Sequence, residues 1–361
     1  MSSKTTLGVI FGGKSSEHEV SCVSAAAVIE AADREKYDVV CVGITREGVW
    51  WIYDGPADMI RSGEWERDTA HLRPAVLSPC PVHHGLIVFN KPEKKYGVLR
   101  LDCVFPVVHG ENCEDGRLQG LLEASGVPYV GCRTCSSAIT MDKAFTKQIL
   151  DGKGVPQAKW LSFTLSDHRS RPEEIDGMIE RELGYPVFVK PANAGSSKGI
   201  SKVPSREGLD AAVLLAGAID EKIVVEEAVR GKEIEVALLE TEDGVKASVC
   251  GQIRPDMEFY SYDSKYVSGG SVCEIPADLD PSVAERVRQT ALSVFGYLDC
   301  RGLSRADFFV KDDGEVIFNE INTLPGFTSI SMYPKLWDYA GLSFSRLVDS
   351  LVSFAMKGEK K

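Results

Sequence analysis

The first 131 residues alternate between strand-like and helix-like segments, and this alternation restricts the fold more than any other feature of the chain. Leu7–Phe11 is an apolar run of strand length that ends in two glycines. A helix is expected next, because Ser16 and Glu19 have the spacing of a capping box and an apolar stripe follows them. The pattern predicts an α/β fold whose first domain contains a largely parallel sheet. Its other expected elements are strands at Val39–Ile44, Val104–Val108 and Val127–Gly131 and a helix at Leu118–Ser125.

A chain of 361 residues is longer than one ordinary domain, at roughly 100–200 residues per domain. We expect three domains, at residues 1–131, 132–229 and 230–361, the last two being α+β units. The polar and aromatic stretch within 256–275 has no regular periodicity and is predicted to be a lid. The stretch from 51 to 92 gives no clear pattern. The main elements expected after residue 131 are helices at Asp142–Leu150 and Phe344–Phe354 and strands at Val187–Lys190, Ile223–Glu226, Glu233–Glu240, Arg305–Val310 and Glu315–Ile321.

The formal net charge of -12 argues against nucleic acid as a partner, because phosphate backbones are bound by basic surfaces. No apolar run approaches the ~20 residues that span a bilayer, so no membrane association is expected. The ten cysteines are scattered among apolar neighbours, which indicates reduced thiols rather than a disulfide framework. We therefore expect a cytoplasmic protein.

Two expected strands of the third domain carry alternating polar residues. Arg305 and Asp307 point to one face of the first strand, and Glu320 and Asn322 point to one face of the second. If the two strands are neighbours, two carboxylates, an amide oxygen and a guanidinium converge. Oxygen ligands beside a fixed cation are what Mg²⁺ and a transferred phosphoryl group require. The pattern therefore predicts a magnesium–phosphate site, and two solvated strand faces are the alternative.

The segment Gly12–Glu17 follows a strand and opens a helix, as dinucleotide-binding loops do. It lacks the third glycine of GxGxxG, and the strand Val39–Ile44 does not end in an acidic residue for a ribose, which excludes a dinucleotide site. Glu17 is then a carboxylate at a helix N-terminus, where the helix dipole keeps it ionised. Such a carboxylate could hold a substrate ammonium or could simply cap the helix.

Lys190 stands at the end of an expected strand and precedes the small-residue loop Gly195–Gly199. Backbone N–H groups, hydroxyls and a lysine charge suit phosphate oxygens, although the residue order is not that of a Walker A loop. An ordinary flexible hairpin is the alternative. Further along the chain, Glu226 could accept a hydrogen bond from an adenine amine, and Glu233 could bind ribose hydroxyls.

Together these segments resemble the ATP-grasp enzymes, in which two α+β units clamp ATP, and within them the D-alanine–D-alanine ligase family. The segments that resemble this family occur in the family's order and span nearly the whole chain. They are Gly12–Ser21, His109–Gly110, Glu114–Gly116, Leu118–Gly120, Met141–Lys143, Lys190 with Gly195–Ser197, Phe259–Tyr266 and Asn319–Thr328.

The resemblance implies a two-step condensation. The carboxylate of a first D-alanine attacks the γ-phosphate of ATP to give an acyl phosphate and ADP, and the amine of a second D-alanine then displaces phosphate. The product, D-alanyl-D-alanine, serves peptidoglycan precursor synthesis. The resemblance also implies two Mg²⁺ ions, for which Mn²⁺ can substitute, an activating monovalent cation as an option, and a homodimer.

The resemblance further implies roles for matching residues. Glu17 holds the ammonium of the first D-alanine, and Ser196 links Glu17 to Tyr266 so that the lid is tied over the site. Arg305 and the backbone N–H of Gly326 stabilise the tetrahedral oxyanion.

The remaining implied roles concern the second substrate, ATP and the metal ions. Ser331 and Lys265 bind the carboxylate of the second substrate, and His109 also belongs to the substrate-binding set. The metal ligands are Asp307, Glu320 and Asn322. The ATP-binding set consists of Lys143, Lys190, Ser196, Ser197, Glu226, Glu227, Val229, Glu233, Phe259, Lys265, Phe309 and Asn319.

The nearest alternative is a D-alanine–D-serine ligase of the vancomycin-resistance type, which has the same fold. Tyr266 favours a dipeptide product over a D-lactate ester. Met332 places an apolar side chain beside the second-substrate pocket, which favours alanine over serine. A nucleotide-binding regulatory protein that lost the chemistry is a further alternative, and the polar residues present at every position expected for catalysis argue against it.

Overall fold

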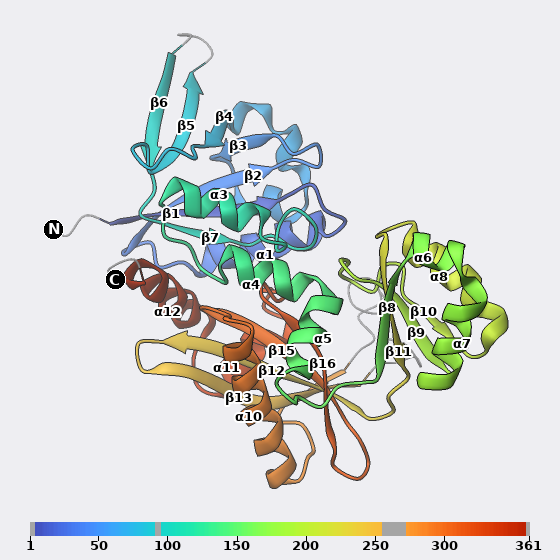
Figure 1. The fold of residues 1–361 in the computed structure, drawn as a ribbon. Coiled ribbons are helices and arrows are strands. Elements are labelled where there is room, and N and C mark those ends of the chain that lie inside the picture. Colours follow the sequence, from blue (N-terminus) through green and yellow to red (C-terminus); the bar gives the residue numbers. More distant parts are fainter. Residues whose placement is uncertain (1–3, 91–94, 255–271, 359–361) are drawn as a thin grey trace.

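The computed structural model describes residues 4–90, 95–254 and 272–358 of the chain. Its strands form three sheets, of seven, four and five strands, which follow one another along the sequence (Figure 1). Each of the three regions expected to be domains contains one of these sheets. The domain boundaries themselves remain a prediction.

The first sheet has the strand order β6-β5-β4-β3-β2-β1-β7. β1 pairs in parallel with β2 and β7, which is the parallel arrangement predicted from the sequence. Strands β3 to β6 extend the sheet in antiparallel pairs, and they come largely from the stretch that gave no clear pattern. The strands are β1 (Thr5–Gly12), β2 (Tyr37–Ile44), β3 (Trp50–Tyr53), β4 (Leu72–Leu77), β5 (Gly85–Asn90), β6 (Lys95–Arg100) and β7 (Cys103–Pro106).

The helices of this region are α1 (His18–Ala31), α2 (Ala57–Arg61) and α3 (Arg117–Ser125), with the 3-10 helices η1 (Glu64–Arg67) and η2 (Thr69–His71). The predicted capping box is wrong. The chain passes through Gly12 and Gly13 at positive φ, the helix begins only at His18, and Glu19 forms an ion pair with Arg46 instead of capping. The predicted strand Val127–Gly131 is reduced to one bridge between Tyr129 and Val104, since Pro128 has no N–H to donate.

The second sheet has the order β10-β9-β11-β8 and only antiparallel pairs. Its three α-helices cover one face of the sheet, and the other face is turned toward the centre of the molecule (Figure 1). The elements are β8 (Trp160–Thr164), α6 (Leu165–Ser170), α7 (Pro172–Glu182), β9 (Val187–Pro191), β10 (Ser201–Val203), η3 (Arg206–Gly208), α8 (Leu209–Gly217) and β11 (Lys222–Glu227). Helices α4 (Thr134–Met141) and α5 (Lys143–Asp151) precede it and connect it to the first sheet.

The third sheet has the order β14-β13-β12-β15-β16 and is antiparallel. Along β12, Val236 and Leu238 pack in one core cluster with α10, whereas Ala237 and Leu239 pack in another cluster with α11 and α12. The two faces of the sheet are therefore covered by different helices. The elements are β12 (Lys232–Thr241), β13 (Gly244–Arg254), β14 (Val272–Glu274), α10 (Pro281–Tyr297), β15 (Leu303–Val310), β16 (Val316–Asn322), α11 (Met332–Tyr339) and α12 (Phe344–Lys357).

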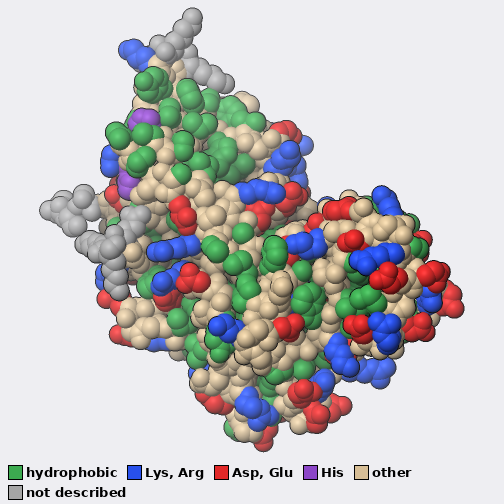
Figure 2. Space-filling model, viewed as in Figure 1, with side chains coloured by type: hydrophobic (Ala, Val, Ile, Leu, Met, Phe, Trp, Pro, Cys, Tyr) green, Lys and Arg blue, Asp and Glu red, His purple; other side chains and the backbone are tan. Residues whose placement is uncertain are grey.

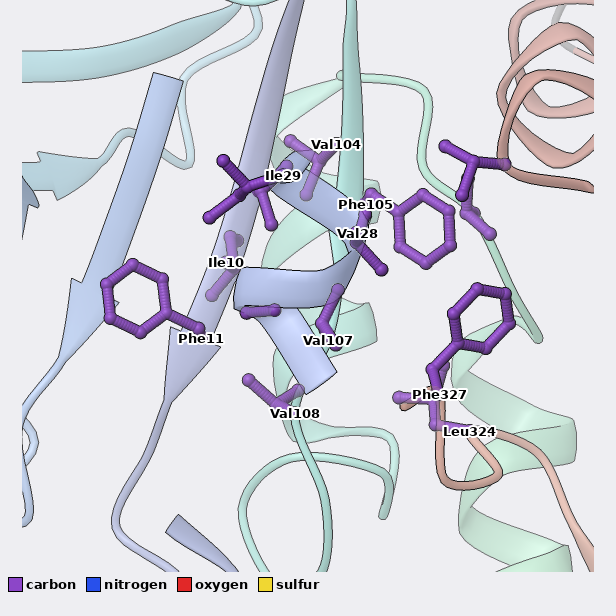
Figure 3. Packing of buried hydrophobic residues seen from close by; sticks show 14 of the residues in the cluster. Ile10, Phe11, Val28, Ile29, Val104, Phe105, Val107, Val108, Leu324 and Phe327 are labelled. Atoms are coloured by element: carbon purple, nitrogen blue, oxygen red, sulfur yellow. The ribbon is translucent and has the colours of Figure 1, made fainter. Parts of the chain in front are cut away.

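One apolar core joins the first and third sheets. Phe327 lies edge-on to Phe105 of β7, with ring centroids 5.6 Å apart, and also contacts Phe344 at the start of α12 (Figure 3). The hydroxyl of Tyr37 donates to Asp349 of α12 at 2.5 Å. The C-terminal helix is thus anchored on the N-terminal sheet by both apolar and polar contacts.

None of the helices in the described part of the chain has both the length and the apolar content needed to cross a membrane. Apolar side chains do reach the surface at the β5–β6 hairpin, which projects from the first sheet (Figures 1 and 2). Phe89, Tyr96 and Val98 are exposed there.

Trp65 of η1 supports the turn that leads to Glu17. Its side chain is fully buried, lies edge-on to Phe11 with ring centroids 5.0 Å apart, and stacks on the His18 ring at 6.5 Å. The Nδ1 atom of His18 is 2.9 Å from the carbonyl oxygen of Gly13. The indole therefore packs against the residues that set the start of α1.

Replacing Trp65 with alanine is expected to lower the free energy of unfolding by about 3–5 kcal/mol, because a large buried ring is lost and a cavity remains. Urea unfolding followed by circular dichroism measures this. The matched control is Tyr339→Ala, which removes an aromatic ring that is 55% exposed; a change within about 0.5 kcal/mol is expected there. Equal effects of the two substitutions would contradict the packing described.

Candidate active site

A cleft of about 1560 Å³ is lined by the start of α1 and the loop after β7 from the first region, and by strands of the second and third sheets. Every predicted site residue within the described ranges lines it, except Asp307, which lies behind Arg305. Phe259, Lys265 and Tyr266 lie outside the described residues. The predicted residues that the structure brings together in the cleft are Glu17, His109, Lys143, Lys190, Ser196, Ser197, Glu226, Glu227, Val229, Glu233, Arg305, Phe309, Asn319, Glu320, Asn322, Gly326 and Ser331.

Glu17 is buried at the N-terminus of α1, just beyond the carboxyl end of β1. Ser196 of the loop after β9 donates a hydrogen bond to its Oε1 at 2.5 Å, which connects two parts of the chain far apart in sequence. Ser196 and Ser197 have φ values of +52° and +57°, a conformation that residues other than glycine rarely adopt. A Cβ on Gly110 would lie 2.5 Å from Glu17 Oε2, so only glycine leaves room for this carboxylate.

Buried His109 and half-buried Glu114 form a pair in the loop after β7. The Nδ1 atom of His109 lies 3.0 Å from the carbonyl oxygen of Leu324 and 3.8 Å from Glu114 Oε2. Burial alone would lower the pKa of His109, but Glu114 outweighs it and the pKa is raised. Burial raises the pKa of Glu114. This pair fixes the segment Leu324–Gly326 against the first sheet.

Three lysines surround Glu226 at the end of β11. Lys190 donates to Glu226 Oε2 at 2.7 Å, and Lys147 lies 3.4 Å from Glu226 Oε1. Burial would raise the pKa of Glu226, but the two lysines together hold that pKa at about 2. Lys143 donates to the carbonyl oxygen of Ala194 at 2.6 Å, and its burial lowers the pKa of its ammonium. The cluster supplies positive charge beside the loop at 195–199.

The strands β15 and β16 are neighbours, as the magnesium–phosphate hypothesis requires. Their register pairs Arg305 with Asn322 and Asp307 with Glu320, and β12 adds Glu235 opposite Asp307. The Arg305 guanidinium donates to both carboxylate oxygens of Asp307, at 2.8 and 2.7 Å, and lies 3.1 Å from Glu235 Oε2. Burial would lower the pKa of Arg305, but the surrounding carboxylates raise it well above its usual range.

A β-bulge sits at Asn319. The pairing register shifts between Asp307 and Phe308, so that Phe308 faces Phe318 and Asn319 is the extra residue of β16. Phe318 is buried in the core below the sheet, whereas Asn319 and Glu320 both line the cleft. Such a bulge turns an additional polar side chain toward the cleft without moving the core residues.

The carboxylates around Arg305 fit a divalent cation bound together with a nucleotide. Asp307 and Glu320 face each other across two strands, and Asn322 Nδ2 donates to Asp307 Oδ2 at 3.1 Å. In the described ranges, no three His, Cys, Asp or Glu side chains form a metal-binding group by themselves. Mg²⁺ commonly takes one or two protein carboxylates and completes its shell with water and phosphate oxygens. The carboxylates outnumber the Arg305 guanidinium, so the cluster has the net negative charge that attracts such an ion.

Ser331 and Gly326 also line the cleft. Ser331 is the N-cap of α11, and its Oγ accepts a hydrogen bond from the backbone N–H of Thr328 at 3.1 Å. A Cβ on Gly326 would lie 3.0 Å from the same oxygen. The N-terminal end of a helix favours an anion. The geometry is suited to a carboxylate close to the Gly326 backbone.

Glu114, Lys147 and Glu235 take part in the charged clusters of the cleft, and the sequence predicted no role for them. Lys147 lies four residues after Lys143 on α5, and Glu235 lies two residues after Glu233 on β12. These spacings place each on the same face as a residue that is predicted. Periodicity could therefore have found both, whereas Glu114 depends on the fold of the loop after β7.

The sequence matches two family descriptions that together cover most of the chain. Residues 6–132 match the family described as "D-ala D-ala ligase N-terminus", and residues 149–353 match "D-ala D-ala ligase C-terminus". The chain belongs to the D-alanine–D-alanine ligase family.

Individual members of the D-alanine–D-alanine ligase family are similar over their full length. The chain is 45% identical over 369 residues to the D-alanine–D-alanine ligase of Acetivibrio thermocellus, covering 99% of this chain and 97% of that one. It is 46% identical over 362 residues to the ligase of Ruminiclostridium cellulolyticum, covering 98% of this chain and 96% of that one.

Solved structures give the same result for the fold. The VanG D-Ala:D-Ser ligase of Enterococcus faecalis superposes with a TM-score of 0.88 at 38% identity. The match covers 98% of this chain and 100% of that one. The D-alanine–D-alanine ligase of Coxiella burnetii gives 0.80 at 32% identity, covering 98% and 94%. The α/β, ATP-grasp fold predicted from the resemblance is confirmed.

The ionised Glu226 and its lysines predict that the free energy of unfolding of this protein depends on pH. Glu226 has a pKa of about 2 in the folded chain against 4.5 ordinarily, so its ionisation stabilises the fold fully above pH 4.5 and progressively less toward pH 2. Glu226→Gln is expected to lower the free energy of unfolding at pH 7 by on the order of 3 kcal/mol. The difference from the wild type should shrink as the pH falls below 4.5.

Urea unfolding at pH 7, 5, 4 and 3 tests this expectation, with the exposed Glu182→Gln as the matched control. The control removes a carboxylate whose partner, Arg181, is also on the surface. It should change the stability by less than about 1 kcal/mol at every pH. A loss of stability in Glu226→Gln that does not vary with pH would count against the ionised cluster.

Proposed function

We propose that the protein joins two D-alanine molecules at the expense of ATP and forms D-alanyl-D-alanine for peptidoglycan precursor synthesis. The observation that carries this proposal is the convergence of three chemistries in one cleft. Glu17 offers a carboxylate for an ammonium, Lys143 and Lys190 offer positive charge for phosphates, and the Arg305 row offers carboxylates for a cation. Membership of the D-alanine–D-alanine ligase family supports the same reaction.

In this proposal the first D-alanine binds with its ammonium on Glu17 and its carboxylate toward Arg305. A carboxylate oxygen attacks the γ-phosphorus of ATP, ADP leaves, and an acyl phosphate forms. Lys143 and Lys190 neutralise the phosphate oxygens during this transfer, which requires little from the protein beyond position and charge. Both ammonium groups lie in a part of the cleft where burial limits competition from water.

The amine of the second D-alanine, held by its carboxylate near Ser331, then attacks the acyl carbonyl. The bond to phosphate breaks, the peptide bond forms and the amine loses its proton. Arg305 and the Gly326 backbone N–H stabilise the negative oxygen of the tetrahedral intermediate. Of the predicted lid 256–275, Val272–Glu274 form β14. Residues 256–271 lie outside the described residues and are proposed to close over the cleft, because an acyl phosphate hydrolyses in water. Ser196, which donates to Glu17, is proposed to bond to Tyr266 of that segment.

Magnesium is proposed at Asp307, Glu320 and Asn322, where it would neutralise charge on the β- and γ-phosphates. Manganese as a substitute, an activating monovalent cation, a homodimer and a cytoplasmic location stay predictions from the sequence.

A D-alanine–D-serine ligase is the second candidate, and the likeness to the VanG enzyme is the observation that favours it. Met332, which is buried and lines the cleft beside Ser331, favours alanine over serine because it offers a hydroxyl no hydrogen bond. A single hydroxyl in an apolar pocket is discriminated by only about a hundredfold. Some use of D-serine is therefore consistent with the main proposal.

The test is to incubate the protein with ATP, Mg²⁺ and D-alanine, and to offer D-alanine, D-serine or D-lactate as the second substrate. Phosphate release and the mass of the product are measured. D-alanyl-D-alanine should dominate, with ADP formed in equal amount. Predominant D-alanyl-D-serine would overturn the main proposal in favour of the second candidate, and ATP binding without any ligation would overturn both.

Arg305→Ala is expected to lower kcat by about a hundredfold or more, since it removes a charge that acts on the tetrahedral oxyanion. Arg305→Lys should retain part of the rate, because it keeps the charge but loses the bidentate geometry toward Asp307. The control is Arg286→Ala, where an exposed arginine donates only to the Gly314 carbonyl. Steady-state kinetics at saturating ATP decide, and a near-normal rate for Arg305→Ala would remove the residue from the mechanism.

A further inference from the structure

Glu226 is held by two lysines that differ in their surroundings. Lys190, on β9, has a side chain that is 13% exposed and donates to Glu226 at 2.7 Å. Lys147, on α5, is only 3% exposed and lies 3.4 Å from the other carboxylate oxygen. No acceptor in the described part of the chain hydrogen-bonds to its buried Nζ. The ammonium of Lys147 is therefore covered, although the residue lines the cleft, whereas the side chain of Lys190 is partly exposed.

The two lysines cannot keep these positions once a nucleotide binds. The proposed function places Lys190 on the phosphates of ATP, so its ammonium must leave Glu226. An ionised carboxylate that is 5% exposed is costly to bury without a counter-charge. Lys147 lines the cleft, but its Nζ is covered, so its ammonium is not offered to a phosphate there. Among the described residues, Lys147 is then the one cation that remains in direct contact with Glu226.

Helix α5 is built to keep Lys147 in this place. The backbone carbonyl oxygen of Lys147 accepts a hydrogen bond from the Gln157 side chain at 3.0 Å, and Gln157 also donates to Asp151 at 2.7 Å. The N-terminus of α5 is capped by Asp142, whose side chain accepts from the backbone of Ala144 and Phe145. Both ends of the helix are thus fixed, and the ammonium is held against Glu226.

We infer that Lys147 is a positioning residue for nucleotide selection: it keeps Glu226 ionised and in place when Lys190 turns to the phosphates, so that Glu226 accepts a hydrogen bond from the 6-amino group of adenine. This inference rests on the proposed ATP site. An ionised carboxylate only accepts hydrogen bonds. It therefore attracts the amine of a 6-aminopurine and repels the carbonyl oxygen of a 6-oxopurine. Lys147 thereby acts on base selection without touching the base.

The charged groups that face Glu226 are Lys147 and Lys143 from α5 and Lys190 from β9, with Asp151 acting on Lys147 from the end of α5. Burial raises the pKa of Glu226, and the lysines lower it. Without Lys147, and with Lys190 on the phosphates, the balance shifts toward the protonated form. The preference for adenine should then weaken as the pH falls.

Calorimetric titration with Mg·ADP and Mg·IDP tests the inference without requiring catalysis, because the two ligands differ at position 6 of the purine. The wild type should bind ADP more tightly than IDP. Lys147→Met should weaken ADP binding by about tenfold or more and IDP binding by less, so that the ADP/IDP ratio falls. Lys147→Arg keeps the charge and should keep most of the ratio. Lys153→Met, an exposed lysine near the end of the same helix, is the matched control.

Two further measurements separate this role from a merely structural one. In Lys147→Met the ADP/IDP ratio should fall further from pH 8 to pH 5.5, whereas the wild-type ratio should stay constant. The double variant Lys147→Met/Glu226→Gln should bind ADP better than the product of the two single losses, because a neutral amide no longer needs a counter-charge. Thermal unfolding of each variant identifies any that has lost its fold, and Lys147→Arg then carries the test.

An unchanged ADP/IDP ratio in Lys147→Met would overturn the inference, as would a wild type that binds the two nucleotides equally. A ratio that falls equally in Lys147→Arg would also overturn it, because the charge would then not be what matters. Failure of the proposed function is a separate result. A wild type that prefers ADP to IDP but forms no dipeptide would sink the ligation and leave the role of Lys147 standing.

Discussion

The register of β12, β15 and β16 is the constraint on which the candidate active site depends. Side chains alternate between the two faces of these strands, so the same register that sends Ala306 and Phe308 into the core sends Arg305 and Asp307 toward the cleft. A slip by one residue would bury the charges and expose the core. The apolar half of each strand therefore specifies where the polar half lies. The bulge at Asn319 adds one polar side chain without disturbing that register.

Charge compensation organises the rest of the cleft. Arg305 is surrounded by carboxylates, so its cluster has a net negative charge. Glu226 is surrounded by lysines, so its cluster has a net positive charge. A nucleoside triphosphate with a divalent cation, the ligand proposed above, carries charges of both signs. The protein thus orders its ionic groups before a ligand arrives, and the ligand exchanges partners rather than creating new charge burial. Preorganisation of this kind lowers the cost of reorganisation on binding and in the transition state.

Much of this could be predicted from the sequence, for identifiable reasons. The strand β1 and the paired strands β15 and β16 have strong local patterns, and Arg305 with Asp307 follows from alternation alone. The antiparallel strands after β2 lack such patterns because part of their length is exposed. Trp65 could not be connected with Glu17, since their link runs through a ring stack on His18 that only the fold creates. Periodicity places Lys147 on the same face of α5 as Lys143, but its contact with Glu226 follows only from the fold.

The anchoring of α12 on the first sheet has a consequence for how the protein is made. The core that contains Leu7 and Phe105 is completed by Leu351 and Val352, which are the last of its buried residues to leave the ribosome. Nascent domains usually fold in order from the N-terminus. Here the N-terminal sheet must wait, with an apolar face uncovered, until almost the entire chain has been synthesised. Translation speed and chaperone capture therefore bear most heavily on the part of the molecule that is made first.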